Sequence, residues 1–226
     1  MSELARLLVP ALRWDAAHGF RYLDGLIDDA LELGAGGFLV EGGPRDEVAA
    51  LVARLHREAP HPLLIAARAE RGAGEAIGGL TPLPPFGAVA AVAVVRQDGS
   101  DVPGLDVEVV RRAARITVRE LKGIGVNWAL APACGAATHV RAASDDPAIV
   151  AAIVAEWVDA CQAEAVLACA LDAPGIGAAT ASARARGVPG QPQGPLAAAV
   201  DGGVASAMPG VAPNDARRAR ALAGRR

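Results

Sequence analysis

The segment 62–85 has the sequence PLLIAARAERGAGEAIGGLTPLPP and contains the pattern that decides the fold. A short apolar run comes first, then a charged, glycine-rich turn, and finally a stretch that Pro82, Pro84 and Pro85 constrain. A near-continuous apolar run is typical of a strand buried on both faces, as in a parallel sheet that helices cover. The segment therefore predicts a buried strand followed by a long connection.

Apolar runs of this kind alternate with helical patterns along the chain, which favours an α/β fold with a parallel sheet and helices outside it. We expect six strands, at 7–11, 37–41, 63–67, 127–131, 166–171 and 205–209. Helices are expected at 20–33, 46–58, 106–123, 147–163, 195–200 and 213–223. The helical spacing is clearest in the fourth, where Ile153 and Trp157 share an apolar face and Asp146 precedes Pro147 as a cap.

Two long connections interrupt this alternation, at 72–88 and 173–195. Both follow the carboxyl end of an expected strand, and in a (β/α) barrel the loops at that end carry the active site. A polar stretch at 97–104 is interpreted as a linker turn. We expect a single domain over residues 1–226, because α/β barrels reach this length undivided.

Composition and charge argue against several classes of partner. The formal net charge is −3, so no strong field attracts the protein to nucleic acid or to an anionic membrane. No apolar run approaches the roughly 20 residues of a membrane-spanning helix, and the first ten residues lack the features of a secretory signal. We therefore expect a cytoplasmic protein that binds neither nucleic acid nor membrane.

The cysteines and histidines indicate no metal site or cofactor. Cys134, Cys161 and Cys169 are an odd number without close pairing, and each lies in an apolar or helical run, so we expect buried free thiols. The four histidines are scattered without the spacing of metal ligands.

Several blocks resemble the N-terminal barrel domain of glycoside hydrolase family 3, in its β-N-acetylglucosaminidase-like branch. They include LLVPALRWD, GGFLVEGG, ERGAG with TPLPP, ITVRELKGIGVNWALAP and VLACA with PGIG, and the likeness runs over about 7–177. The resemblance implies a partial TIM-like (β/α) barrel with about six of the eight β/α units. The first and sixth strands would then be open edges, so we expect one of three outcomes: pairing with another chain to form a homo-oligomer, a terminal helix that closes the edge, or low stability.

The motifs that the family uses for catalysis are altered in this chain. Arg68 stands where the resemblance implies an Asp that holds sugar hydroxyls, and a guanidinium only donates hydrogen bonds. The stretch 171–177 replaces a Lys-His-Phe-Pro-Gly-His-Gly motif and lacks its lysine and histidines. A gap-free alignment puts Arg184 in place of the histidine that protonates the leaving oxygen.

One binding residue of the family is retained. Arg141 matches the arginine of an Arg-Ser-Phe motif, whereas Gly135 replaces an Asp that contacts substrate in the family. In the family, the nucleophilic Asp lies on the seventh strand of the barrel. We expect this sequence, which runs to Arg226, not to include that strand. Neither carboxyl-type function of a retaining glycosidase is then present.

Another acidic pair could replace the lost one. Glu70 follows the third expected strand and Asp172 ends the fifth, which places them roughly 10 Å apart at sheet spacing. That separation suits an inverting glycosidase. The alternative is structural: Glu70 pairs with Arg68 or Arg71, and Asp172 caps the next loop.

Aromatic side chains offer a further ligand contact. Trp14 and Trp128 stand at strand ends, where they either form the floor of a sugar pocket or pack in the core. The candidate substrate-binding residues are therefore Arg141, Arg68 and Trp14.

Together these patterns predict a non-catalytic or degenerate relative of a family 3 β-glycosidase. Its expected role is carbohydrate binding or scaffolding, or none if the chain is a decayed fragment. The alternative is an active O-glycosyl hydrolase that acts on β-linked N-acetylglucosamine or glucose through Glu70 and Asp172.

Overall fold

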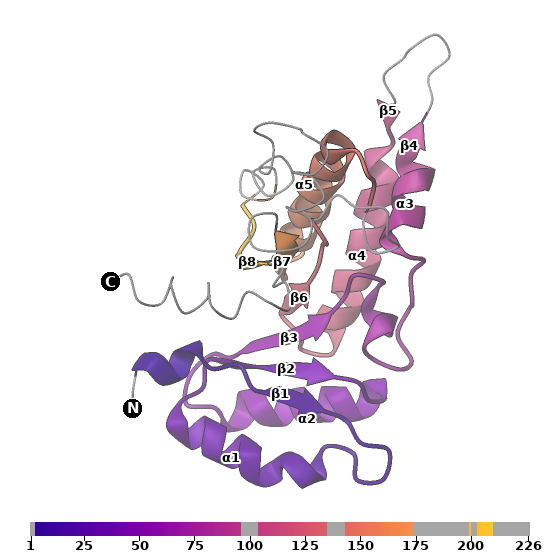
Figure 1. Ribbon diagram of the computed structural model, residues 1–226. Coiled ribbons are helices and arrows are strands. Elements are labelled where there is room, and N and C mark those ends of the chain that lie inside the picture. Colours follow the sequence, from indigo (N-terminus) through magenta and orange to yellow (C-terminus); the bar gives the residue numbers. More distant parts are fainter. Residues whose placement is uncertain (1–2, 96–103, 135–142, 174–198, 200–202, 210–226) are drawn as a thin grey trace, which may run out of the picture. The chain divides into compact units, whose positions relative to one another are not determined.

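Six strands form one parallel sheet in the order β1-β2-β3-β6-β7-β8 (Figure 1). The computed structural model describes residues 3–95, 104–134, 143–173, 199 and 203–209. The strands are β1 (Ala11–Arg13), β2 (Gly37–Glu41), β3 (Leu64–Arg68), β6 (Trp128–Leu130), β7 (Leu167–Ala173) and β8 (Ser206–Pro209). Every neighbouring pair is parallel, which confirms the α/β sheet that the sequence predicts.

The chain divides into two compact units. The first comprises Met1–Pro84, Arg112–Leu130 and Ala160–Ala168, and the second comprises Pro85–Arg111, Ala131–Asp159 and Cys169–Arg226. The first unit holds β1, β2, β3, β6 and the start of β7, and the second holds the rest of β7 and β8.

Helices follow most of the strands. The α-helices are α1 (Asp24–Leu33), α2 (Arg45–Glu58), α3 (Phe86–Ala93), α4 (Val107–Gly123) and α5 (Pro147–Ala163). Short 3-10 helices cover η1 (Glu3–Leu7), η2 (Arg21–Leu23) and η3 (Ala73–Glu75), and an antiparallel pair joins β4 (Val94–Val95) to β5 (Gly104–Leu105). None of the described helices is long and apolar enough to cross a membrane.

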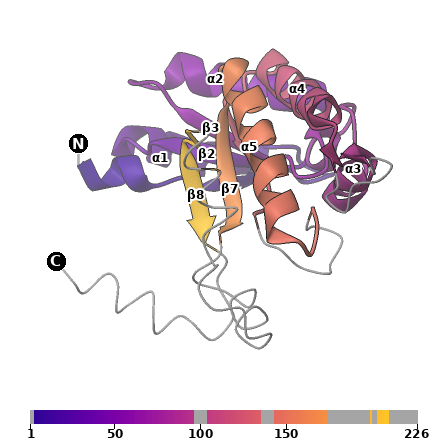
Figure 2. The same ribbon diagram turned by 90° about the horizontal axis from the view of Figure 1, so that it is seen from above.

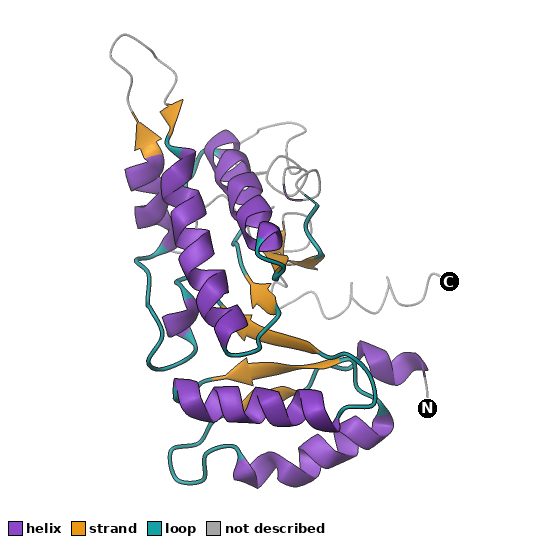
Figure 3. Cartoon of the chain, turned by 180° about the vertical axis from the view of Figure 1, so that it is seen from behind, coloured by secondary structure: helices purple, strands orange, loops and turns teal. Residues whose placement is uncertain are grey.

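One face of the sheet in the first unit is completely buried. The strand register aligns one residue from each of five strands in a row, and each is 0% exposed: Leu12, Val40, Ala67, Ala129 and Ala168. Helices α1 and α2 lie along this part of the sheet (Figures 1 and 3), with buried apolar residues of their own such as Ile27 and Leu55. Helix packing therefore seals this face.

The opposite face is more open. Because side chains alternate between the faces of a strand, the next row belongs to the other side of the sheet. It aligns Ala11, Leu39, Ala66, Trp128 and Leu167. Leu167 is 37% exposed, Leu39 and Trp128 are half-buried, and Ala66 is buried.

Asn127 joins β6 to β3 through its side chain. Its Oδ1 accepts a hydrogen bond from the Ile65 backbone N–H at 2.8 Å, and its Nδ2 donates to the Leu63 carbonyl at 2.9 Å. An amide has one acceptor and one donor end, so Asn127 imitates a peptide group of the sheet.

In the second unit, α5 lies alongside β7 (Figure 2) and begins as predicted. The Asp146 side chain accepts a hydrogen bond from the Ala148 N–H at 2.8 Å, so Asp146 caps the helix. Trp157 is 1% exposed and meets Phe86 of α3 edge to face, with ring centroids 5.2 Å apart. The predicted apolar face of this helix is confirmed.

The first strand and α3 differ from the sequence prediction. The strand expected at 7–11 occupies Ala11–Arg13, because Leu7 ends a 3-10 helix with 76% of its surface exposed and Pro10 has no N–H to donate. Helix α3 was not predicted, and it begins at Phe86, inside the connection expected at 72–88. Its nearly uniform apolarity conceals the helical period, although Phe86, Val89 and Ala93 share its buried side.

Other expected elements are tested only in part. The helix at 213–223 and nearly all of that at 195–200 lie outside the described residues, as does the linker except for Gly104, which begins β5. Strands β1 and β8 are the outermost of the described sheet, and homo-oligomers through these edges remain a prediction.

We predict that two adjacent residues of β3 respond very differently to truncation. Ile65 is 0% exposed on the sealed face, and Leu64 is 39% exposed on the other. Ile65→Ala should lower the free energy of unfolding by about 2–5 kcal/mol, and Leu64→Ala by about 1 kcal/mol or less. Denaturant unfolding of both variants measures this. Equal losses would contradict the assignment of the two faces.

Candidate functional site

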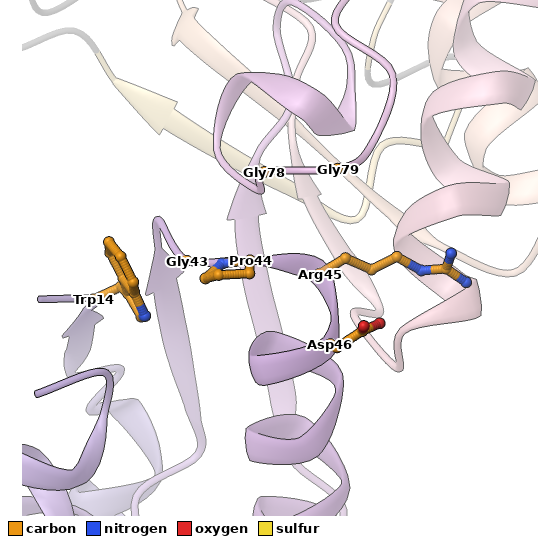
Figure 4. A pocket seen from close by; sticks show the side chains of 7 residues that line it. All are labelled: Trp14, Gly43, Pro44, Arg45, Asp46, Gly78 and Gly79. Carbon is orange, nitrogen blue, oxygen red and sulfur yellow. The ribbon is translucent and has the colours of Figure 1, made fainter. Parts of the chain in front are cut away.

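A pocket of about 630 Å³ lies where β1, β2 and β3 give way to their loops (Figure 4). Its lining residues are Trp14, Gly43, Pro44, Arg45, Asp46, Gly78 and Gly79. Trp14 directly follows β1, the stretch 43–46 joins β2 to α2, and the two other glycines belong to the connection after β3. The pocket therefore occupies the end of the sheet at which the sequence predicts function.

Backbone hydrogen bonds bring these three loops together. The Gly78 N–H donates to the Gly43 carbonyl at 2.9 Å, and the Arg45 N–H donates to the Gly78 carbonyl at 2.8 Å. Gly43 has a φ of +99°, and a Cβ there would stand 3.1 Å from the Trp14 ring and 3.2 Å from Phe20. Only glycine allows both this backbone conformation and the close approach of the rings.

The connection after β3 is folded rather than extended. The Gly74 N–H donates to the Thr81 carbonyl at 3.0 Å, and the Leu83 N–H donates to the Arg71 carbonyl at 2.8 Å. Glu120 of α4 accepts from both the backbone N–H and the hydroxyl of Thr81, at 2.8 and 2.6 Å. These bonds hold the connection that contributes Gly78 and Gly79 to the pocket.

Trp14 is fixed in the pocket wall. Its Nε1 donates to Glu47 Oε2 at 2.9 Å, and the residue is half-buried. A second pocket of about 540 Å³ also has Trp14 in its lining, together with Phe20, Arg21 and Glu47. Of the two predicted substrate-binding residues that the structure describes, Trp14 lines both pockets and Arg68 lines neither.

Most acidic groups around this end of the sheet are already engaged. Arg13 donates to Glu41 Oε2 from Nε at 3.1 Å and from Nη2 at 2.8 Å. Asp15 accepts from His18 at 2.8 Å, and this hydrogen bond, with those from backbone N–H groups, lowers the pKa of the Asp15 carboxyl. Bonds to the charged form stabilise it, so Asp15 is ionised near neutral pH.

The predicted catalytic candidates are placed only in part. Glu70 is 6% exposed, and its backbone forms an isolated β-bridge with Gly72 in a tight turn. Glu70 also interacts with other groups of the protein. Asp172 lies in β7 where the register with β8 shifts, between Leu171 and Ala173. The two belong to different units, and their separation stays a prediction.

Of the two arginine candidates, the structure describes Arg68 alone. Arg68 is the last residue of β3 and is exposed. Its pairing with Glu70, one of the two arginine pairings considered for that carboxylate, stays a prediction. Arg141 lies outside the described residues.

Sequence reasoning missed the contributions of Arg45 and Asp46 to the pocket. The signal was available, because GGPRD directly follows a predicted strand and opens a predicted helix. In the part of the chain that the structure describes, no group of three His, Cys, Asp or Glu side chains is arranged to hold a metal.

The fold and the pocket define a class: a parallel α/β domain of TIM-like type with its site at the carboxyl ends of the strands. The family model for the glycosyl hydrolase family 3 N-terminal domain matches residues 44–215, and the chain belongs to this family.

Relatives of known name support this membership. A protein from Cellulomonas fimi named beta-N-acetylglucosaminidase/beta-glucosidase is 34% identical over 152 residues, which are 64% of this chain and 25% of that protein. The chain therefore matches only about a quarter of the length of this relative.

Solved structures of the family share the fold. A β-N-acetylglucosaminidase from Paenibacillus sp. str. FPU-7 superposes with a TM-score of 0.69 at 22% identity, over 94% of this chain and 43% of that one. NagZ from Neisseria gonorrhoeae, in complex with N-trifluoroacetyl-D-glucosamine, has a TM-score of 0.69 at 17% identity, over 92% and 65%. The expected TIM-like fold is confirmed.

We predict that the thiols react only after unfolding. Cys134, Cys161 and Cys169 are free and buried, and burial raises the pKa of both Cys161 and Cys169. A thiolate attacks the disulfide bond of a labelling reagent and displaces its other half as a free thiolate, and burial disfavours the thiolate form. Ellman's reagent should therefore label the native protein very slowly and all three thiols in guanidinium. A thiol that reacts rapidly in the native protein would contradict the burial.

Proposed function

We propose that this protein is a non-catalytic relative of the family 3 β-glycosidases and binds carbohydrate at the carboxyl ends of its strands. The observation that carries this proposal is the make-up of the pocket wall. Among the described residues that line it, Asp46 is the single carboxylate. A glycosidase needs two carboxyl-type groups on either side of the scissile bond, about 5 Å apart for retention and 6.5–9.5 Å for inversion.

Neighbouring carboxylates are poorly suited to supply the second group. Glu41 accepts two hydrogen bonds from Arg13, and Glu47 accepts one from the Trp14 indole. A nucleophile or base must present a free lone pair to the substrate or to water. Using Glu47 in this way would break the contact that orients Trp14.

The same wall has the features of a small-ligand site. Pockets of this kind combine an aromatic surface with a few polar groups that fix orientation. Trp14 supplies a rigid ring face, and Arg45 and Asp46 supply donors and acceptors. The names of the relatives suggest β-linked N-acetylglucosamine or glucose as the sugar.

The second candidate function is an active O-glycosyl hydrolase that uses Glu70 and Asp172. The observation in its favour is the burial of Glu70, which with Thr117 makes up the buried polar residues of the described chain. A buried carboxyl group near the site is the type of residue that can serve as a general acid.

We predict no turnover of aryl β-N-acetylglucosaminides or aryl β-glucosides. Release of the aryl group should equal that of Glu70→Gln and Asp172→Asn variants, because neither carboxyl group takes part in catalysis. An authentic β-N-acetylglucosaminidase is the positive control. Turnover that falls by orders of magnitude in either variant would establish the hydrolase instead.

We predict that chitobiose binds with a dissociation constant in the millimolar range and changes tryptophan emission. Trp14→Ala should abolish the response, because the ring forms the pocket wall. Trp128→Phe, which removes a different half-buried indole, should leave the affinity unchanged. The absence of any response at millimolar ligand would favour a decayed fragment over a binding protein.

A further inference from the structure

A tight turn at residues 15–19 directly follows Trp14, the aromatic residue that lines both pockets. Two backbone hydrogen bonds close this turn. The Gly19 N–H donates to the Asp15 carbonyl at 2.8 Å, and the Asp15 N–H donates to the Gly19 carbonyl at 3.1 Å. The backbone that follows Trp14 is therefore folded back on itself immediately after β1.

One oxygen of Asp15 holds the inside of the turn. Asp15 Oδ1 accepts hydrogen bonds from the Ala17 N–H at 3.0 Å and from the His18 N–H at 2.9 Å, and the His18 ring Nδ1 lies 2.8 Å from the same oxygen. Hydrogen bonds to an ionised carboxylate are stronger than those between neutral groups. Ala16, Ala17 and His18 are all exposed, so these bonds, and not apolar packing, determine the shape of the turn.

The far end of the turn packs against the group that orients Trp14. Gly19 has a φ of +61°, and a Cβ there would stand 2.9 Å from Glu47 Oε2. The same oxygen accepts the hydrogen bond from Trp14 Nε1 at 2.9 Å. A displacement of Gly19 therefore reaches the indole through Glu47.

Glu47 by itself is a weak support for the ring. Its side chain is exposed and long, and such a side chain has many rotamers when nothing packs behind it. The turn supplies that backing, because Gly19 stands next to the carboxylate. The orientation of Trp14 thus depends on the turn as well as on Glu47.

We infer that Asp15 is a positioning residue of the binding site, because its carboxylate fixes the 15–19 turn and the turn holds the Trp14 ring in the pocket wall. The inference rests on the proposed carbohydrate binding and adds a residue that lines neither pocket itself. A ring that is held in one orientation before the ligand arrives loses less conformational freedom on binding, so this pre-organisation contributes to affinity.

The first test needs no ligand and measures how accessible the Trp14 ring is. In a Trp128→Phe background, acrylamide quenching reports on Trp14, because Trp157 is 1% exposed. Asp15→Ala should increase the quenching and shift the emission to longer wavelength, since the released ring meets more water. Asp15→Asn should stay close to the parent, because its amide oxygen can still accept hydrogen bonds from the two backbone N–H groups.

The second test is a titration of the same variants with chitobiose. Asp15→Ala should weaken binding about three- to tenfold, which is the cost of immobilising one side chain on binding. Asp15→Asn should restore most of the affinity. Gly19→Ala acts at the other end of the turn, where the added methyl group displaces Glu47, and should weaken binding to a similar extent.

Asp29→Ala is the matched control. Asp29 is exposed on α1, so its removal changes the net charge by the same amount and should leave both quenching and affinity unchanged. Circular dichroism melting curves check that each variant is folded.

The outcomes separate this inference from the proposed function. Quenching and affinity that stay unchanged in Asp15→Ala would refute the positioning role and leave carbohydrate binding standing. A loss that Asp15→Asn does not restore would also refute it, because the site would then need the charge and not the turn. If the parent protein does not bind chitobiose, the proposed function fails, and the quenching result alone decides whether Asp15 holds the ring.

Discussion

The structure depends on one close-packed row of small and branched side chains across five strands. Leu12, Val40, Ala67, Ala129 and Ala168 share one face of the sheet, and none is exposed. Three of the five are alanines, which let helices approach closely but leave little room for a larger group. The register of these residues also determines which residues meet at the carboxyl ends of the strands, where the pocket forms.

The site is therefore a product of register more than of local motifs. Arg13 and Glu41 pair because β1 and β2 align them, and Gly43 meets Gly78 because parallel strands bring their following loops to one edge. The TPLPP stretch has a similar role: Thr81 ties its connection to α4 through Glu120, which keeps Gly78 beside the start of α2. The family resemblance in these blocks thus reflects contacts that position backbone.

Sequence reasoning succeeded where one local pattern determines the element. The bounds of β2 and α5 are those predicted, since buried apolar runs and a capped amphipathic helix are local signals. It failed for the first strand, because Leu7 is apolar in the sequence but exposed in the structure. It also failed for α3, because a nearly uniform apolar sequence shows no helical period. It identified Trp14 and Arg68 singly, but the pairing of Glu41 with Arg13 required a register that links residues far apart in the chain.

The two faces of this sheet contribute differently to stability. The helices pack on one side, so a substitution at Arg68 or Glu41 on the other side removes little buried apolar area. Charged residues at these positions can therefore change with little cost to folding, because the sealed row does not include them. The same separation explains how an arginine can stand at the end of β3, because its charged group lies where water reaches it and the buried row is unaffected.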